Sequence, residues 1–267
     1  MTPASKSTAI VTGAARGIGL AIARRFLAQG WRVALVDIDA QTLGSIRGEM
    51  ETPDTLIIEA DVSDPAQVAR AVSETEAHFG RIDALVNNAG IAIFKPVLET
   101  SYEDWSRVLA VNLTGPFLTV QAAAPVMMKS GGGAVVNIGS ISGQRASTLR
   151  VAYGTSKAGL AHLTKQQAAE LAEIGIRVNC VAPGPVDTAM AKAVHSAEIR
   201  ADYHDAIPLN RYGTEEEIAE VVVFLCSPKA SYLTGQTIGV DGGFDASGIG
   251  LPTLRATTRP DDRESDT

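Results

Sequence analysis

The amino-acid sequence predicts an α/β fold in one domain, a doubly wound parallel sheet of about seven strands with helices on both faces. Short apolar runs alternate with longer helix-like segments from Ala9 to about Val240. Several runs, such as Val33–Val36, are apolar without alternation, which is typical of strands covered on both faces. Parallel strands need helical crossovers, and the intervening segments have the required length. The expected strands are Ala9–Thr12, Arg32–Asp37, Thr55–Ala60, Ile82–Asn87, Ala134–Ile138, Ile176–Val181 and Thr237–Val240.

Size and composition favour one domain and argue against several classes of protein. The chain has 267 residues, 45% of them hydrophobic, which is enough for a single sizeable core. Its formal net charge of -7 argues against broad binding to nucleic acids or to anionic membranes. We expect the domain to span residues 1–251, followed by a disordered polar tail at 252–267.

The sequence shows no signal for export, membrane insertion or metal binding. Its first residues lack the basic and then apolar profile of a signal peptide, and no apolar run approaches the ~20 residues that span a bilayer. Cys180 and Cys226 lie in apolar runs without metal-binding spacing, which indicates buried reduced thiols. We therefore expect a cytoplasmic protein that holds no metal.

A glycine-rich turn follows the first expected strand and leads into a helix expected over Leu20–Gln29. Gly13, Gly17 and Gly19 are spaced Gly-x-x-x-Gly-x-Gly across it. Glycines let the backbone turn tightly and approach a pyrophosphate, whose charge the exposed amides of the helix N-terminus would meet. A glycine-rich turn can also be purely structural, but the strand before it and the helix after it favour a dinucleotide site.

Two charged residues near this turn bear on the choice of cofactor. Asp37 lies 18 residues after Gly19, at the end of the second expected strand, where a carboxylate would bind the adenosine ribose hydroxyls and repel a 2′-phosphate. Arg16 would instead attract that phosphate. We give Asp37 more weight and expect NAD, with NADP as the less favoured alternative.

Tyr153 and Lys157 open a segment that is expected to be helical to about Gly175. Four residues apart, their side chains share one helix face. A free tyrosine has a pKa near ~10, and a fixed cation beside it would lower that pKa and make the phenol a proton acceptor. Such pairs also occur on ordinary solvated helix faces, so the pair gains meaning only from its context.

These motifs together resemble the short-chain dehydrogenase/reductase family, and the match covers nearly the whole chain. Thr12–Gly19 matches the family's cofactor turn, Asn87–Gly90 its motif after the fourth strand, and Tyr153 with Lys157 its active-site signature. The resemblance implies a Rossmann-type fold and a hydride-transfer enzyme. It also implies a catalytic set that consists of Asn112, Ser140, Tyr153 and Lys157.

The family implies a role for each of these four residues. Tyr153 would act as the acid/base, and Lys157 would lower the tyrosine pKa and hold the nicotinamide ribose. Ser140 would hydrogen-bond the substrate oxygen; only the family interval separates it from Ser142, since either serine could cap the turn between them. Asn112 would organise a water-linked proton path, or would simply kink its helix with its amide satisfied by backbone.

The resemblance also implies cofactor contacts at the strand ends. Asp61 and Val62 would meet the adenine, although Asp61 could merely end a strand. Asn88 and Gly90 would approach the adenosine ribose, although their run could also knit neighbouring strands together. The loop Pro183–Thr188 would bend around the nicotinamide. The full expected set is Gly13, Arg16, Gly17, Ile18, Gly19, Asp37, Asp61, Val62, Asn88, Gly90, Tyr153, Lys157, Pro183, Gly184, Val186 and Thr188.

Residues 189–212 have a looser pattern, and we expect them to form a mobile lid over the substrate, as a long inserted loop. His195, Tyr203 and His204 lie there, but lone histidines are more often solvated surface groups, so we assign them no role. Arg145 and Arg150, between the expected catalytic serine and tyrosine, raise the hypothesis of an anionic substrate. A surface or subunit-contact arginine is the simpler interpretation.

The predicted function is NAD-dependent interconversion of a secondary alcohol, such as a sugar, polyol or cyclic alcohol, and its ketone. An NADPH-dependent carbonyl or 3-oxoacyl reductase is the alternative, with Arg16 as its discriminating feature. A non-catalytic nucleotide-sensing protein on the same fold is a third possibility, against which the intact catalytic set argues. Family resemblance further implies a homotetramer built on Asp104–Lys129 and Ala152–Glu173. From the net charge we expect no nucleic-acid or membrane partner.

Overall fold

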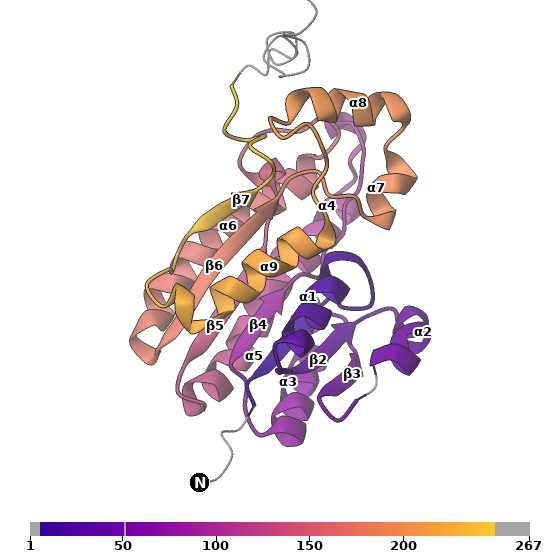
Figure 1. The fold of residues 1–267 in the computed structure, drawn as a ribbon. Coiled ribbons are helices and arrows are strands. Elements are labelled where there is room, and N and C mark those ends of the chain that lie inside the picture. Colours follow the sequence, from indigo (N-terminus) through magenta and orange to yellow (C-terminus); the bar gives the residue numbers. More distant parts are fainter. Residues whose placement is uncertain (1–5, 51, 249–267) are drawn as a thin grey trace, which may run out of the picture.

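Within residues 6–50 and 52–248, which the computed structural model describes, seven parallel strands form one sheet (Figure 1). The order is β3-β2-β1-β4-β5-β6-β7, so the chain builds outward from β1 to β3, returns to the middle at β4, and builds outward the other way. The strands are β1 (Thr8–Thr12), β2 (Arg32–Asp37), β3 (Thr55–Glu59), β4 (Ala84–Asn87), β5 (Gly133–Ile138), β6 (Ile176–Pro183) and β7 (Thr237–Val240).

This sheet confirms the predicted doubly wound α/β fold, and each expected strand is present to within two residues at either end. β1 and β4 are buried along their whole length, which is why their sequences are apolar without alternation. β4 begins at Ala84 and not at Ile82, because the Asp83 carboxylate accepts the Thr8 amide at 2.8 Å where a ladder carbonyl would otherwise lie. The predicted tail at 252–267 lies outside the described residues.

Helices cover both faces of the sheet, and each face has its own core. Phe26 of α1 is fully buried on one face, where α9 also packs, and Met127 of α5 is fully buried on the other, beside α3 and α6. Successive strand residues feed the two cores alternately, as Ile10 and Val11 do in β1. The α-helices are α1 (Gly17–Ala28), α2 (Ala40–Met50), α3 (Pro65–Phe79), α4 (Tyr102–Leu109), α5 (Gly115–Lys129), α6 (Val151–Leu171), α7 (Ala189–Val194), α8 (Ala197–Ala206) and α9 (Glu215–Cys226), with short helical segments η1 (Val97–Glu99), η2 (Ala110–Thr114), η3 (Ile141–Gly143), η4 (Ala172–Ile174) and η5 (Pro228–Ala230).

One helical segment, Tyr102–Lys129, runs unbroken through α4, the π-helical η2 and α5. By length and composition alone this segment could cross a membrane. From the sequence we expected no segment of this kind. Val120 and Met127 on this segment are buried in the core on the sheet. Its apolar character is therefore explained by packing within the protein.

The lid differs from the long loop that its sequence suggested. Residues 189–206 form two short helices, α7 and α8, which lie beyond the carboxyl ends of the strands at one end of the molecule (Figure 1). Each helix has a side-chain cap: Thr188 Oγ1 accepts the Ala191 amide at 3.1 Å, and Ser196 Oγ accepts the Ile199 amide at 3.4 Å. Local capping supplies the helix starts that the weak hydrophobic pattern did not predict.

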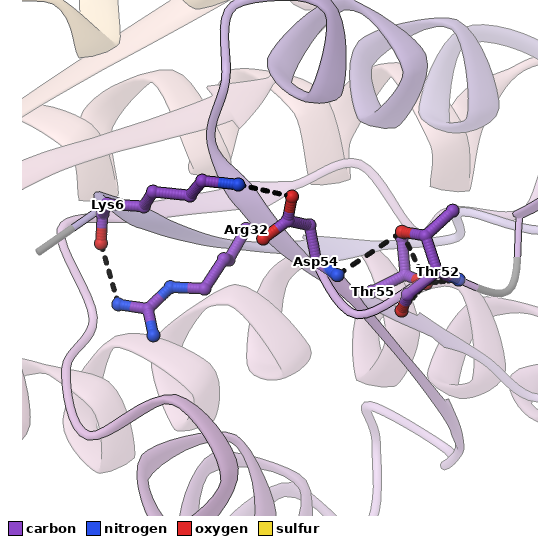
Figure 2. Close-up of polar contacts among 5 residues, drawn as sticks. All are labelled: Lys6, Arg32, Thr52, Asp54 and Thr55. Carbon is purple, nitrogen blue, oxygen red and sulfur yellow. Dashed lines mark hydrogen bonds and ion pairs between the residues drawn. The ribbon is translucent and has the colours of Figure 1, made fainter.

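Polar contacts connect the amino ends of β1, β2 and β3, at the end of the sheet opposite the lid (Figure 2). Lys6 pairs with Asp54 at 2.5 Å, and Arg32 donates to the Lys6 carbonyl at 2.7 Å. Thr55 Oγ1 accepts the Thr52 amide at 2.8 Å and closes the turn into β3. These contacts fix the amino ends of the strands, and the loops at the carboxyl ends are the ones left to form a ligand crevice.

Candidate active site

The glycine-rich turn between β1 and α1 is built for close backbone approach. Gly13 has a φ of 63°, which favours glycine. A Cβ on Gly19 would lie 2.1 Å from the Gly13 carbonyl oxygen, so no larger residue fits there without movement. α1 begins at Gly17, and the side chain of its N-cap residue Arg16 makes no cap hydrogen bond to the first amides, which have no partner within the helix. A cradle that a Cβ would fill, at a helix N-terminus, fits the pyrophosphate of a dinucleotide.

Asp37 and Arg16 lie at the same end of the sheet, but their charges are already engaged. The Asp37 carboxylate accepts the Ala15 amide at 3.0 Å and the Asp39 amide at 3.1 Å. Arg16 pairs with the carboxylate of Asp39, which also accepts two hydrogen bonds from Thr42 at the start of α2. Those hydrogen bonds from Thr42, followed by the Arg16 charge, lower the pKa of Asp39. Two carboxylates therefore flank the expected ribose position.

The residues expected around the adenosine also hold the crevice together. Asn88 Nδ2 donates to the carbonyl oxygens of Thr12 and Gly13 at 3.0 Å each, so this side chain ties the glycine-rich turn to the end of β4. Asp61 Oδ1 accepts the Ser63 amide at 2.8 Å and shapes the turn after β3. Its neighbour Val62 is buried. The sequence left two roles open for Asn88, contact with the cofactor and a link between neighbouring strands. The structure shows the second of these roles.

The loop after β6 is held in a sharply defined path. A Cβ on Gly184 would lie 2.7 Å from the Cα of Asp241 after β7, so the two chains touch at this position. Val186 is buried and forms a backbone bridge with Gly213. Thr188 caps α7 through its hydroxyl oxygen. This loop forms the wall between the sheet and the lid.

Tyr153 and Ser140 come together at the floor of the crevice, from α6 and from the end of β5. A hydrogen bond joins their side chains, and Ser140 Oγ also accepts the Ser142 amide at 3.1 Å. Ser142 Oγ instead contacts Ser147 at 3.0 Å and does not line the pocket. Of the two serines that spacing alone could not separate, Ser140 is the one beside the tyrosine.

Lys157 is buried one helical turn after Tyr153, with its Nζ 5.7 Å from the centre of the tyrosine ring. Nζ donates to the Ile138 carbonyl at 2.7 Å. Burial lowers the pKa of Lys157 to about 8. The expected lowering of the tyrosine pKa by Lys157 is not found: burial raises the pKa of Tyr153, and the opposing effects come from the Ser140 hydrogen bond and the Arg150 charge.

Asn112 lies fully buried in η2, between α4 and α5. Its Oδ1 accepts the Ile91 amide at 2.8 Å, and its Nδ2 donates to the Ile91 carbonyl at 2.9 Å and to Ser156 Oγ at 3.1 Å. The backbone of Gly90 separates it from Lys157, since a Cβ there would be 3.3 Å from Asn112 Oδ1 and 3.5 Å from Lys157 Nζ. The side chain therefore accompanies a π-helical bulge and fixes the loop after β4.

A pocket opens where these elements meet, and its lining divides the expected residues into two groups. Those that line it are Ile18, Asn88, Gly90, Ser140, Tyr153, Lys157, Pro183, Gly184, Val186 and Thr188. The others do not line it, namely Gly13, Arg16, Gly17, Gly19, Asp37, Asp61, Val62 and Asn112. The pocket thus takes in the residues expected around the nicotinamide and the substrate, together with Asn88 and Gly90, which were expected at the adenosine ribose.

Comparison with known proteins gives a family for this arrangement. The family described as enoyl-(acyl carrier protein) reductase matches residues 13–245. The chain belongs to the short-chain dehydrogenase/reductase family. It is 40% identical over 239 residues to the 3-oxoacyl-[acyl-carrier-protein] reductase FabG of Thermotoga maritima, covering 88% of this chain and 96% of the relative.

Two further relatives come from Xanthobacter autotrophicus. The chain is 39% identical over 244 residues to 2-(S)-hydroxypropyl-CoM dehydrogenase 3, covering 88% of this chain and 95% of the relative. It is 41% identical over 245 residues to 2-(R)-hydroxypropyl-CoM dehydrogenase, covering 89% and 98%. As a short-chain dehydrogenase/reductase, the protein is an oxidoreductase that acts on CH–OH groups of small molecules.

Some pocket residues were not assigned by the sequence. Phe94, Arg150, His195 and Tyr203 all line the pocket, the last two from the lid. His195 Nδ1 lies 3.0 Å from the Tyr212 hydroxyl, so it is partnered and not simply solvated. The sequence signal for pocket residues in the lid was its aromatic content, with His195, Tyr203 and Tyr212 in one stretch. The sequence does not show which of these side chains point inward, because that depends on how the helices pack.

Proposed function

We propose that the protein is an NAD-dependent oxidoreductase that interconverts a secondary alcohol and its ketone, with Tyr153 as the proton donor and acceptor. The observation that carries the proposal is that Tyr153, Ser140 and Lys157 line one pocket together. Hydride exchange with the reacting carbon is the chemistry that the nicotinamide supplies when bound. The fit of the glycine-rich turn to a pyrophosphate supports such a cofactor.

The three side chains divide the proton chemistry between them. Ser140 would donate a hydrogen bond from its hydroxyl to the substrate oxygen, where negative charge develops during reaction. Tyr153 takes the hydroxyl proton when the alcohol is oxidised and returns it when the ketone is reduced. Lys157 lines the same pocket one helical turn after the tyrosine, and it would hold the cofactor ribose. The raised pKa of Tyr153 in the free protein suits the donor role, because the phenol stays protonated.

Charge at the ribose end supports NAD over NADP. Asp37 ends β2 with its carboxylate fixed by two backbone amides, and Asp39 follows it. The guanidinium of Arg16, which could bind a 2′-phosphate, pairs with Asp39. A phosphorylated ribose would have to displace that pairing and approach two carboxylates.

A second candidate is an NADPH-dependent 3-oxoacyl reductase. The Thermotoga maritima relative is named as a 3-oxoacyl reductase, so the comparisons support this candidate better than the first. None of the three relatives named above carries a sugar, polyol or cyclic alcohol in its name. We therefore keep the substrate of the first candidate at the level of a secondary alcohol or ketone.

Initial rates distinguish the two candidates. The purified chain is assayed with a panel of secondary alcohols against NAD and NADP, and with a 3-oxoacyl thioester against NADH and NADPH, by the absorbance of the reduced nicotinamide. The first candidate predicts the higher kcat/KM with the unphosphorylated cofactor for whichever substrate reacts. Equal or better turnover with the phosphorylated cofactor would overturn the NAD assignment, and a strong preference for the thioester would favour the second candidate.

The proposal extends to a homotetramer in the cytoplasm. Phe117 and Met128 on α5 are 46% and 50% exposed, and an apolar helix face of this kind supports pairing between subunits. Size-exclusion chromatography with light scattering tests the assembly, and a monomeric mass at micromolar concentration would rule it out. Cell fractionation tests the compartment.

A further inference from the structure

The pocket carries positive charge in a chain whose net charge is -7. Its ionisable lining includes Arg150, Lys157 and His195, and no aspartate or glutamate is among the lining residues in the described part of the chain. The ammonium of Lys157 is directed at the Ile138 carbonyl, below the floor. Arg150 is thus the cation that the pocket presents to a substrate, and its surroundings decide what it can bind.

No carboxylate neutralises Arg150. Among the ion pairs formed within residues 6–50 and 52–248, none includes it. Its Nη1 makes a long hydrogen bond of 3.4 Å to Ser142 Oγ, and the guanidinium lies 5.0 Å from the centre of the Phe94 ring. Stacking on an aromatic face orients the planar group and leaves N–H edges free for an anion.

The backbone around Arg150 is held in an unusual conformation. Leu149, directly before it, has a φ of 61°, in the left-handed region that a leucine rarely adopts. The Leu149 carbonyl accepts the Lys95 amide at 3.1 Å, and a backbone bridge joins Lys95 to Arg150. The chain therefore turns sharply before α6, and that turn delivers the arginine to the pocket wall.

Other arginines nearby are committed elsewhere. Arg145 is exposed, donates to the Phe244 carbonyl at 2.7 Å and stacks on the Phe244 ring at 4.8 Å, and it does not line the pocket. Arg200 pairs with Asp187 at 2.9 Å. Of the two arginines that the sequence raised as candidates for anion recognition, the structure separates Arg150 from Arg145.

The positive field of Arg150 reaches the neighbouring titratable groups. It lowers the pKa of Tyr153 against the effect of burial, and it adds to burial in lowering the pKa of His195. Both effects are those of a guanidinium whose charge is not cancelled locally. A bound anion would therefore gain from Arg150 and also change the electrostatics of the reacting tyrosine.

We propose that Arg150 binds an anionic group of the substrate, so that the substrate is a secondary alcohol or ketone bearing a carboxylate, sulfonate or phosphate. This inference rests on the proposed function. Arg150 is the N-cap residue of α6, three residues before Tyr153, and both side chains line the same pocket. The anion is accordingly a few bonds from the reacting carbon. A 3-oxoacyl group joined to a carrier by a thioester has no charge at that position.

Matched acid and ester substrates test the inference. We compare 3-hydroxybutyrate with methyl 3-hydroxybutanoate in wild type, Arg150→Gln, Arg150→Lys and Arg145→Gln, and repeat the acid arm with 2-hydroxypropane-1-sulfonate and 2-hydroxypropyl phosphate. We expect Arg150→Gln to lower kcat/KM for the anion by about 10- to 100-fold, mainly through KM, and to change the ester by less than about 3-fold. Arg150→Lys recovers part of the loss because it keeps the charge without the fork.

Arg145→Gln is the control and is expected to match wild type on both substrates. Equal losses on acid and ester in Arg150→Gln, or a wild-type preference for the ester, would overturn the inference. The arm with the highest wild-type kcat/KM identifies the anion among the three.

A binding measurement keeps the inference separable from the proposed function. Calorimetry of the NAD-loaded wild type with acetoacetate and with methyl acetoacetate needs no turnover. Tighter binding of the acid, lost in Arg150→Gln, supports the anion site even if no alcohol in the panel reacts. Equal binding of acid and ester would contradict the anion site even if the protein proves to be an active dehydrogenase.

Discussion

Lys157 donates a hydrogen bond from Nζ to the carbonyl oxygen of Ile138 at 2.7 Å. That carbonyl ends β5, and the lysine reaches it from α6 across the floor of the pocket. The contact holds the ammonium in place, but it does not offset burial, which lowers the pKa of Lys157 to about 8. The lysine therefore titrates well below the ordinary lysine range.

This low pKa makes a prediction about stability. Folded Lys157 has a pKa of about 8 against an ordinary lysine value of 10.5, so between these values the unfolded chain binds more protons. Stability from this group must then rise as pH rises through that window, and the buried charge is destabilising below it. At pH 7 we expect the unfolding free energy of Lys157→Met to be higher than that of wild type, or to be least reduced relative to it. Between pH 7 and pH 10, wild type should gain up to about 3 kcal/mol in unfolding free energy relative to the variant.

Denaturant unfolding of the two proteins at several pH values gives this difference directly, since contributions from the other groups cancel. A difference that stays constant between pH 7 and pH 10 would mean that Lys157 is not the titrating group.

Replacement of the Tyr153 hydroxyl isolates its role in proton transfer. Tyr153→Phe is expected to lower kcat by about 100- to 10,000-fold, the range for loss of a positioned acid/base, while NADH still binds. Tyr232→Phe is the matched control, because Tyr232 is fully exposed and is not among the residues that line the pocket. Kinetics and NADH fluorescence titration are measured on both. A Tyr153→Phe enzyme with more than a tenth of wild-type kcat would assign the proton transfer to another group.

Asp39 is expected to favour NADH over NADPH, because its ion pair with Arg16 keeps the guanidinium from a 2′-phosphate. Asp39→Asn keeps an oxygen to accept the Thr42 amide at the start of α2 and removes the charge that pairs with the guanidinium. We expect binding of NADPH to strengthen by about 5- to 10-fold while binding of NADH changes by less than about 2-fold, since the pair is exposed and screened. Adding Arg16→Gln should reverse the gain. Fluorescence titration with both cofactors is the measurement, and an unchanged ratio of the two affinities counts against this role.

Much of this protein could be predicted from the sequence, for identifiable physical reasons. Strands covered on both faces must be apolar throughout, so runs such as Val33–Val36 mark them. Gly19 and Gly13 touch so closely that only glycine fits, which leaves a visible pattern. The pairing of Arg16 with Asp39 leaves none, because the two residues come from separate loops 23 positions apart.

The wall of the pocket shows the same limit. Arg145 and Arg150 are five positions apart and of one type, yet a left-handed Leu149 and the ring of Phe94 send only the second into the pocket. His195 enters it because α7 and α8 fold over the strand ends. Such directions depend on tertiary contacts, and no local periodicity records them.

Gly19→Ala tests whether the glycine-rich turn is as tight as the geometry indicates. The new Cβ would lie 2.1 Å from the Gly13 carbonyl oxygen and 2.5 Å from Asn88 Nδ2, so backbone in the turn must shift. We expect a loss of NADH binding of at least about 10-fold and a cost of about 1–3 kcal/mol in unfolding free energy. Gly44→Ala in α2 is the control, because its new Cβ meets nothing within 4 Å. Alanine there should stabilise by about 0.5–1 kcal/mol and leave binding unchanged, since a helix interior favours it over glycine. Equal effects of the two substitutions would contradict the explanation that close contact with the turn restricts position 19 to glycine.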